Sequence, residues 1–103
     1  MKYGIFDIKD NILDIRNDRF LVISAAQLRA ARALLGIDQK RLAEICGLSV
    51  PTIQRMEASE GVIRGNVDSL MKLVAALDTA GIELIGENAT SSAGGRGVRL
   101  KLR

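Results

Sequence analysis

The segment from Gln39 to Met56 constrains the fold most, because it predicts two helices that are each too short to be stable alone. Asp38 can cap the first of them, which must end at Gly47, and Ser49 can cap the second, which has proline in its first turn. Helices of about two turns persist only when they share a core. The glycine permits the positive φ of a tight turn, and the small Ala43 allows the two helices to approach closely.

The flanking segments predict two further helices. Ser24 with Gln27 three residues later forms a capping box, and Gly36 is a left-handed stop. Asn66 can cap a last helix that Gly81 ends. Apolar residues recur at spacings of three and four throughout, which places them on core-facing stripes. The residues expected in the core are Leu28, Ala31, Leu35, Leu42, Cys46, Leu48, Ile53, Met56, Leu70, Leu73, Val74 and Leu77.

The two ends of the chain carry different patterns. Residues 1–23 are rich in isoleucine between Asx turn signals, and their spacing fits short strands as well as a helix. We expect this extension to cover the core or a partner surface. Residues 82–85 and 98–102 alternate on either side of a Gly/Ser-rich loop, which predicts a β-hairpin with one basic face. The fold class is therefore mainly α, with an extension at 1–23, a four-helix domain at 24–81 and a hairpin at 82–103.

Composition excludes several classes of function. The chain has no histidine, which excludes Cys/His zinc sites, serine-histidine hydrolysis and histidine acid-base chemistry. Its acids are scattered and no Gly-rich phosphate loop follows a strand, so we expect no enzyme, cofactor or metal site. Cys46 is the single cysteine, and we expect a core residue in a reducing cytoplasm. A signal-peptide pattern and a membrane-length apolar run are both missing, which also favours the cytoplasm.

The second short helix carries the side chains that predict a function. A helix held in this way projects its N-terminal half into the major groove of DNA. Arg55 can pair bidentately with guanine, Gln54 can pair with adenine, and Val50 can touch a thymine methyl group. Gln39 and Ser49 are suited to phosphates. The residues predicted to bind DNA are Gln39, Lys40, Ser49, Val50, Thr52, Gln54, Arg55 and Arg64.

The stretches QKRLAE at 39–44 and GLSVPTIQRME at 47–57 resemble the XRE (lambda-repressor/Cro-like) family of helix-turn-helix regulators, and the resemblance covers residues 24–81. It implies a backbone and base contact for Gln39, and an internal ion pair between Arg32 and Glu57. The family often has polar base readers where this chain has Val50 and Pro51. Specificity is therefore expected to depend more on Arg55, on its neighbours in the helix and on DNA shape.

Two functions follow from this interpretation. The first is a homodimeric repressor that places two recognition helices in major grooves about 34 Å apart, without a small-molecule effector. The second is a DNA-binding antitoxin that also binds a toxin protein. A protein-interaction module without DNA affinity is a third. The net charge is +3, and the basic C-terminal strand fits a solvated face, a phosphate contact or a dimer edge.

Overall fold

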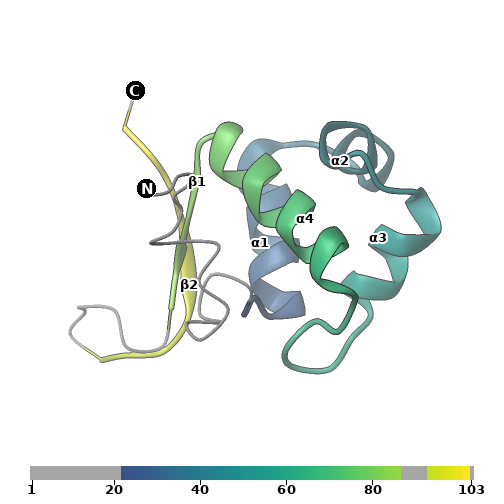
Figure 1. Cartoon of the computed structure of the whole chain (residues 1–103). Coiled ribbons are helices and arrows are strands. Elements are labelled where there is room, and N and C mark those ends of the chain that lie inside the picture. The colour runs from purple at the N-terminus through teal and green to yellow at the C-terminus, as the bar shows by residue number, and fades with distance from the viewer. Residues whose placement is uncertain (1–21, 87–92, 103) are drawn as a thin grey trace, which may run out of the picture.

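The computed structural model describes residues 22–86 and 93–102 of the chain. Helices α1 (Ala25–Leu35), α2 (Gln39–Cys46), α3 (Val50–Glu57) and α4 (Val67–Thr79) precede an antiparallel hairpin of β1 (Ile82–Ile85) and β2 (Gly97–Leu100). The hairpin packs on α1 and α4, and α3 lies on the far side of these helices (Figure 1). The mainly α fold with a C-terminal hairpin is confirmed. The strands considered for residues 1–23 fall almost wholly outside the described residues.

The predicted helix caps are confirmed, and they explain where each helix begins and ends. Each N-cap side chain accepts a hydrogen bond from the amide three residues later, at Ser24, Asp38, Ser49 and Asn66. Gly36 and Gly47 adopt left-handed φ values of 68° and 71°, which end α1 and α2. The last helix ends at Thr79, one residue earlier than a stop at Gly81 predicts, because Ala80 is the C-cap and Gly81, with a positive φ of 102°, turns the chain into β1.

The core holds most of the apolar residues that helical spacing predicted. Leu35, Leu48 and Val74 are exceptions, since they are only half-buried. Ile23 and Ile63 are buried although no helical stripe contains them. They come together because the segment before α1 pairs with the segment after α3, where the amide of Ile63 donates to the carbonyl of Ile23 over 2.9 Å. This pairing joins the two ends of the segment that contains α1, α2 and α3.

Gln27 attaches the hairpin to α1. Its side chain is buried, and Nε2 donates to the carbonyl oxygens of Ile85 at 3.1 Å and Gly97 at 2.9 Å. Strand β2 runs over residues 97–100 instead of the predicted 98–102. It ends there because β1 begins at Ile82, and beyond Leu100 only the Lys101 amide still reaches the partner strand, at the carbonyl of Gly81.

Candidate nucleic-acid interface

The turn between α2 and α3 fixes the angle between the two short helices. Gly47 turns the chain with its left-handed backbone, and the amide of Leu48 then donates to the carbonyl of Ala43 over 3.0 Å. Ala43 is buried, and Ile53 of α3 is buried in the same core as Leu42 of α2. Because both helices share this core, α3 is presented as a rigid element.

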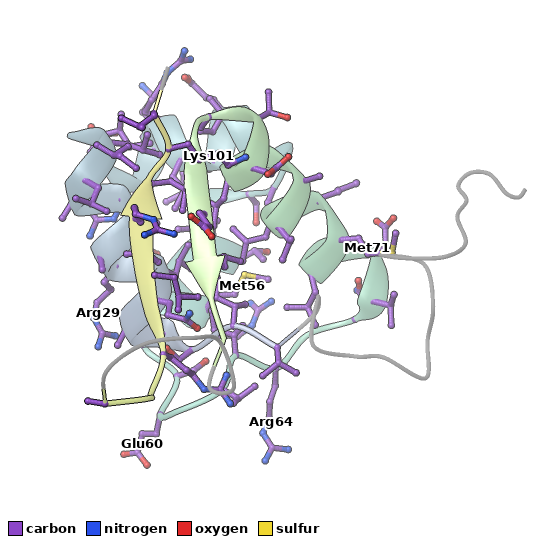
Figure 2. The ribbon with its side chains drawn as sticks, turned by 90° about the vertical axis from the view of Figure 1, so that its left-hand side faces the viewer. Arg29, Met56, Glu60, Arg64, Met71 and Lys101 are labelled. Atoms are coloured by element: carbon purple, nitrogen blue, oxygen red, sulfur yellow. The ribbon has the colours of Figure 1, made fainter. Side chains whose placement is uncertain are left out.

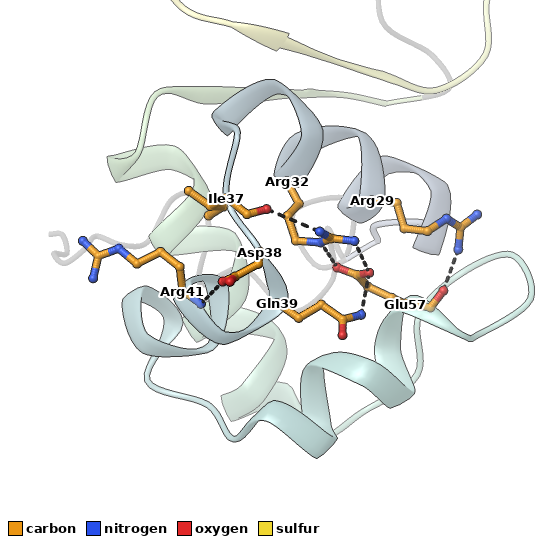
Figure 3. A network of polar contacts seen from close by, with 7 residues as sticks. All are labelled: Arg29, Arg32, Ile37, Asp38, Gln39, Arg41 and Glu57. Atoms are coloured by element: carbon orange, nitrogen blue, oxygen red, sulfur yellow. Dashed lines mark hydrogen bonds and ion pairs between the residues drawn. The ribbon is translucent and has the colours of Figure 1, made fainter.

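A buried carboxylate joins α1, α2 and α3. Glu57, which is 5% exposed, ends α3 and accepts two hydrogen bonds from Arg32 of α1, at 2.7 Å from Nε and 3.0 Å from Nη2 (Figure 3). Gln39, the first residue of α2, donates from Nε2 to the same carboxylate over 3.0 Å. The predicted ion pair between Arg32 and Glu57 is therefore confirmed. Its bidentate geometry is the strongest arrangement available to an arginine and a carboxylate.

The charge on Glu57 is maintained by its partners. Burial on its own would raise the pKa of this carboxyl, but the hydrogen bonds from Arg32 and Gln39 outweigh burial and hold the pKa below its usual value. The carboxylate is therefore ionised at neutral pH. Because Nε2 of Gln39 donates one hydrogen bond to Glu57, the orientation of the Gln39 side-chain amide is fixed.

Arg29 is a member of this network that the sequence analysis missed. Its Nη1 donates to the main-chain carbonyl of Glu57, at the C-terminal end of α3 (Figure 3). A cation is favourable there because the carbonyl groups at a helix C-terminus carry partial negative charge. Arg29 lies one turn before Arg32 on α1, so the spacing of three between the two arginines is the signal that could have identified it.

The predicted DNA-binding residues divide into an exposed and a half-buried group. Lys40, Ser49, Gln54, Arg55 and Arg64 are exposed, and Gln39, Val50 and Thr52 are half-buried. Val50 packs partly on the core, so less of its side chain faces outward than the sequence analysis assumed. The hydroxyl of Thr52 lies 2.8 Å from that of Ser49, within the cap of α3.

Comparison with known families agrees with this geometry. A family model described as helix-turn-helix matches residues 28–84, which is more than half of the chain. The chain belongs to the XRE family of Cro/C1-type helix-turn-helix proteins. This family consists of DNA-binding domains and not of enzymes, so the protein is a DNA-binding regulator of transcription. No curated protein matches the chain.

The basic side chains of this XRE-family protein differ in whether an acidic side chain of the same chain pairs with them. On the hairpin, Arg99 lies 2.7 Å from the Glu83 carboxylate and Lys101 pairs with Asp78, so the face predicted to be basic is largely balanced. Within residues 22–86 and 93–102, by contrast, no ion pair involves Lys40, Arg55 or Arg64. Figure 2 shows Arg64 extending from the end of the molecule opposite Lys101. Unbalanced positive charge therefore lies away from the hairpin.

Cys46 is confirmed as a core residue. It is 5% exposed, and burial raises the pKa of its thiol to about 11. The thiol is therefore protonated and unreactive at neutral pH. Among the described residues, no group of three or more potential metal ligands lies close enough to hold an ion, and none of their helices is long and apolar enough to span a membrane.

Proposed function

We propose that this protein is a homodimeric transcriptional repressor that recognises an operator in double-stranded DNA through α3. One observation supports the proposal most strongly: α3 exposes Gln54 and Arg55, which has no ion pair among the described residues, while its last residue, Glu57, is fixed to α1 and α2. The side chains that face outward are therefore supported by a rigid element. Such preorganisation is what specific base contacts require.

The exposed side chains of α3 suit direct readout of bases. Arg55 has the planar fork that pairs bidentately with guanine, and Gln54 has the amide that pairs with adenine. Val50 has only part of its surface available for a thymine methyl group, and Pro51 beside it offers no side-chain hydrogen bond. We infer that few bases are read directly and that DNA shape contributes the rest of the specificity.

The remaining predicted residues suit the DNA backbone. Ser49 and the first amides of α3 lie at a helix N-terminus, where phosphate oxygens are favoured. Lys40 and Arg64 are exposed and have no ion pair among the described residues, so both are available to phosphates. Gln39 keeps a carbonyl oxygen and a second N–H for the DNA after its hydrogen bond to Glu57. These contacts set the register of α3 in the groove.

A pair of matched arginine variants tests the proposal. The assay is titration of the protein with DNA from its own upstream region at two salt concentrations. Arg55→Ala should weaken operator binding by roughly 5-fold to 150-fold, the equivalent of about 1–3 kcal/mol for a bidentate base contact. Arg99→Ala removes the same charge from the hairpin on the opposite side, and its affinity should stay within about twofold.

Each outcome of this titration has a clear meaning. Saturable binding that weakens with salt and is lost selectively in Arg55→Ala supports operator recognition by α3. Equal losses in both variants would show that charge alone attracts the DNA, and absence of binding at low salt would refute the proposal. The antitoxin alternative stays a prediction from the sequence, because no contact within residues 22–86 and 93–102 favours a toxin over a second copy of the chain.

A further inference from the structure

One exposed face of α1 is apolar and is flanked by the exposed Arg29. Residues three or four positions apart lie on the same side of a helix. On α1 this spacing relates Ala26, Ala30, Ala33 and Leu34. Leu34 is 43% exposed, and Leu100 at the end of β2 is 47% exposed. Leu34 lies two turns after Gln27, whose amide binds β2, so its side chain faces the hairpin. We call Ala26, Ala30, Ala33, Leu34 and Leu100 the α1–β2 surface.

Strand β2 adds an open edge to this surface. Arg99 of β2 pairs with Glu83, and the amide of Lys101, just after β2, binds the carbonyl of Gly81, just before β1, so these alternate residues direct their main-chain groups toward the β1 side. Val98 and Leu100 therefore direct theirs to the other edge. The described residues provide no hydrogen-bond partner at that edge. Figure 2 shows β2 on the α1 side of the hairpin and β1 on the α4 side, which places the open edge beside the exposed face of α1.

We propose that the α1–β2 surface binds a second copy of this chain. In this dimer β2 pairs with β2 of the other copy in antiparallel orientation, and the two alanine faces of α1 pack together beneath the joined sheet. Alanine permits helix axes to approach to about 8 Å, the short end of the usual range. The proposal rests on the proposed function, because it names the surface through which the repressor dimerises.

The symmetry of such a dimer suits binding to one DNA duplex. Two identical strands that pair edge to edge in antiparallel orientation are related by a two-fold axis perpendicular to the sheet. Such an axis leaves the helices of both copies on the same face of the joined sheet. Since α3 lies beyond α1 and α4 from the hairpin, both recognition helices face the same direction (Figure 1).

The size of the molecule also fits. Its principal extents are 37 × 34 × 30 Å, so two copies side by side have their centres about one molecular width apart. Half-sites separated by one turn of DNA lie about 34–36 Å apart. A dimer joined through the β2 edge therefore separates the centres of its two copies by about the distance between adjacent major grooves on one side of a duplex.

Charge favours the β2 edge over the β1 edge. The cations of β2 and its end would repel those of a second copy, but Arg99 and Lys101 are each paired with an acid of their own chain. The alanine face of α1 has no charge of its own, and the exposed Arg29 that flanks it donates to the main-chain carbonyl of Glu57, on the α3 side. Helix α4, beside β1, exposes Asp68 and Lys72, which would have to be desolvated in a contact. A like-for-like contact is therefore least costly along β2 and α1.

A charge placed on the α1–β2 surface tests the proposal. We would compare the full-length protein with Ala30→Glu by sedimentation equilibrium, because the two-fold axis brings the two new carboxylates close together. The dissociation constant of the dimer should rise by about tenfold or more. Val67→Glu is the matched control, since Val67 is 56% exposed on α4 and outside the surface, and its dissociation constant should stay within about twofold.

The outcomes separate this proposal from the proposed function. A wild-type protein that stays monomeric at DNA-binding concentrations, or an Ala30→Glu variant that dimerises normally, would overturn the interface. A monomeric wild type in which Ala30→Glu lowers the melting temperature would also overturn it, and would indicate that another segment of the chain covers α1. If the wild type dimerises and Ala30→Glu does not, yet neither binds upstream DNA, the interface stands and the repressor function fails.

Discussion

Replacing Glu57 with glutamine removes the negative charge at the centre of the network that joins α1, α2 and α3. Glutamine keeps the size of the side chain and one acceptor oxygen, so Arg32 loses a charged partner without a cavity being created. Arg32 is then left beside a neutral amide, and one of its two hydrogen bonds to the carboxylate, of 2.7 and 3.0 Å, is lost or weakened. The hydrogen bond from Gln39 competes for the same remaining oxygen.

The expected loss of stability follows from the burial of the pair. Removing one partner of a fully buried ion pair costs about 3–5 kcal/mol. Arg32 is 27% exposed and keeps some contact with water, and glutamine still accepts one hydrogen bond, so we expect about 2 kcal/mol. For a domain of this size, such a loss lowers the melting temperature by roughly 8–16 °C. Circular dichroism during thermal and urea unfolding, at one protein concentration, measures both quantities.

The effect of Glu57→Gln should depend on pH. A carboxyl whose pKa is lowered by folding stabilises the native state above its unfolded pKa, near 4.5, and this contribution disappears as pH falls through the folded pKa. The difference between wild type and variant should therefore be largest at neutral pH and shrink below about pH 4.5.

Glu44→Gln provides the control for this prediction. The Glu44 carboxylate pairs with Arg41 at 3.2 Å on the surface, where both side chains are more than half exposed. Its neutralisation should change the free energy of unfolding by no more than about 0.5 kcal/mol. The reasoning is refuted if Glu57→Gln is no more destabilising than Glu44→Gln at neutral pH, or if its effect grows as pH falls.

Three further predictions concern other parts of the molecule. Gln27→Ala should lower the free energy of unfolding by about 2–4 kcal/mol, because it removes a capping box and two buried bonds to the hairpin; urea unfolding measures the loss, and a change under 1 kcal/mol would contradict the role given to this residue. Gly47→Ala should cost about 1–2 kcal/mol through its left-handed φ of 71°, whereas Gly65→Ala, whose added Cβ makes only ordinary contacts at 3.6 Å or more, should be nearly neutral by the same assay. Cys46 should resist a thiol reagent at pH 8 in the native protein and react on unfolding, and rapid native labelling would disprove its burial.

The parts of the fold that were predicted correctly depend on local chemistry. Each N-cap, such as Ser24 or Asp38, binds an amide three residues away, so the sequence contains both partners within one turn. The left-handed glycine at Gly47 follows from the same short range. The ion pair between Arg32 and Glu57 spans 25 residues, and it was predicted from the family resemblance instead of from spacing.

The features that were missed depend on contacts between distant segments. Gln27 was predicted as part of a helix cap, but its hydrogen bond to the carbonyl of Ile85 joins residues that are 58 positions apart in the sequence. The last strand was predicted to have a basic face, and the acidic partner of Arg99 was not predicted. The register that sets Arg99 opposite Glu83 depends on the hairpin loop. Val50 was expected to face outward, and only the packed arrangement of α2 and α3 shows that it leans on the core. Periodicity within one element cannot supply these distances.

The most direct test of the central claim is to map which residues respond when the protein binds DNA. We would record amide chemical shifts by NMR while adding DNA from the upstream region. Binding through α3 predicts that the largest changes fall at the start of α2 and along α3, around Lys40, Ser49 and Arg55, with small changes in β1 and β2. Largest changes in the hairpin, or none in α3 at saturating DNA, would contradict the assignment of α3 as the recognition helix.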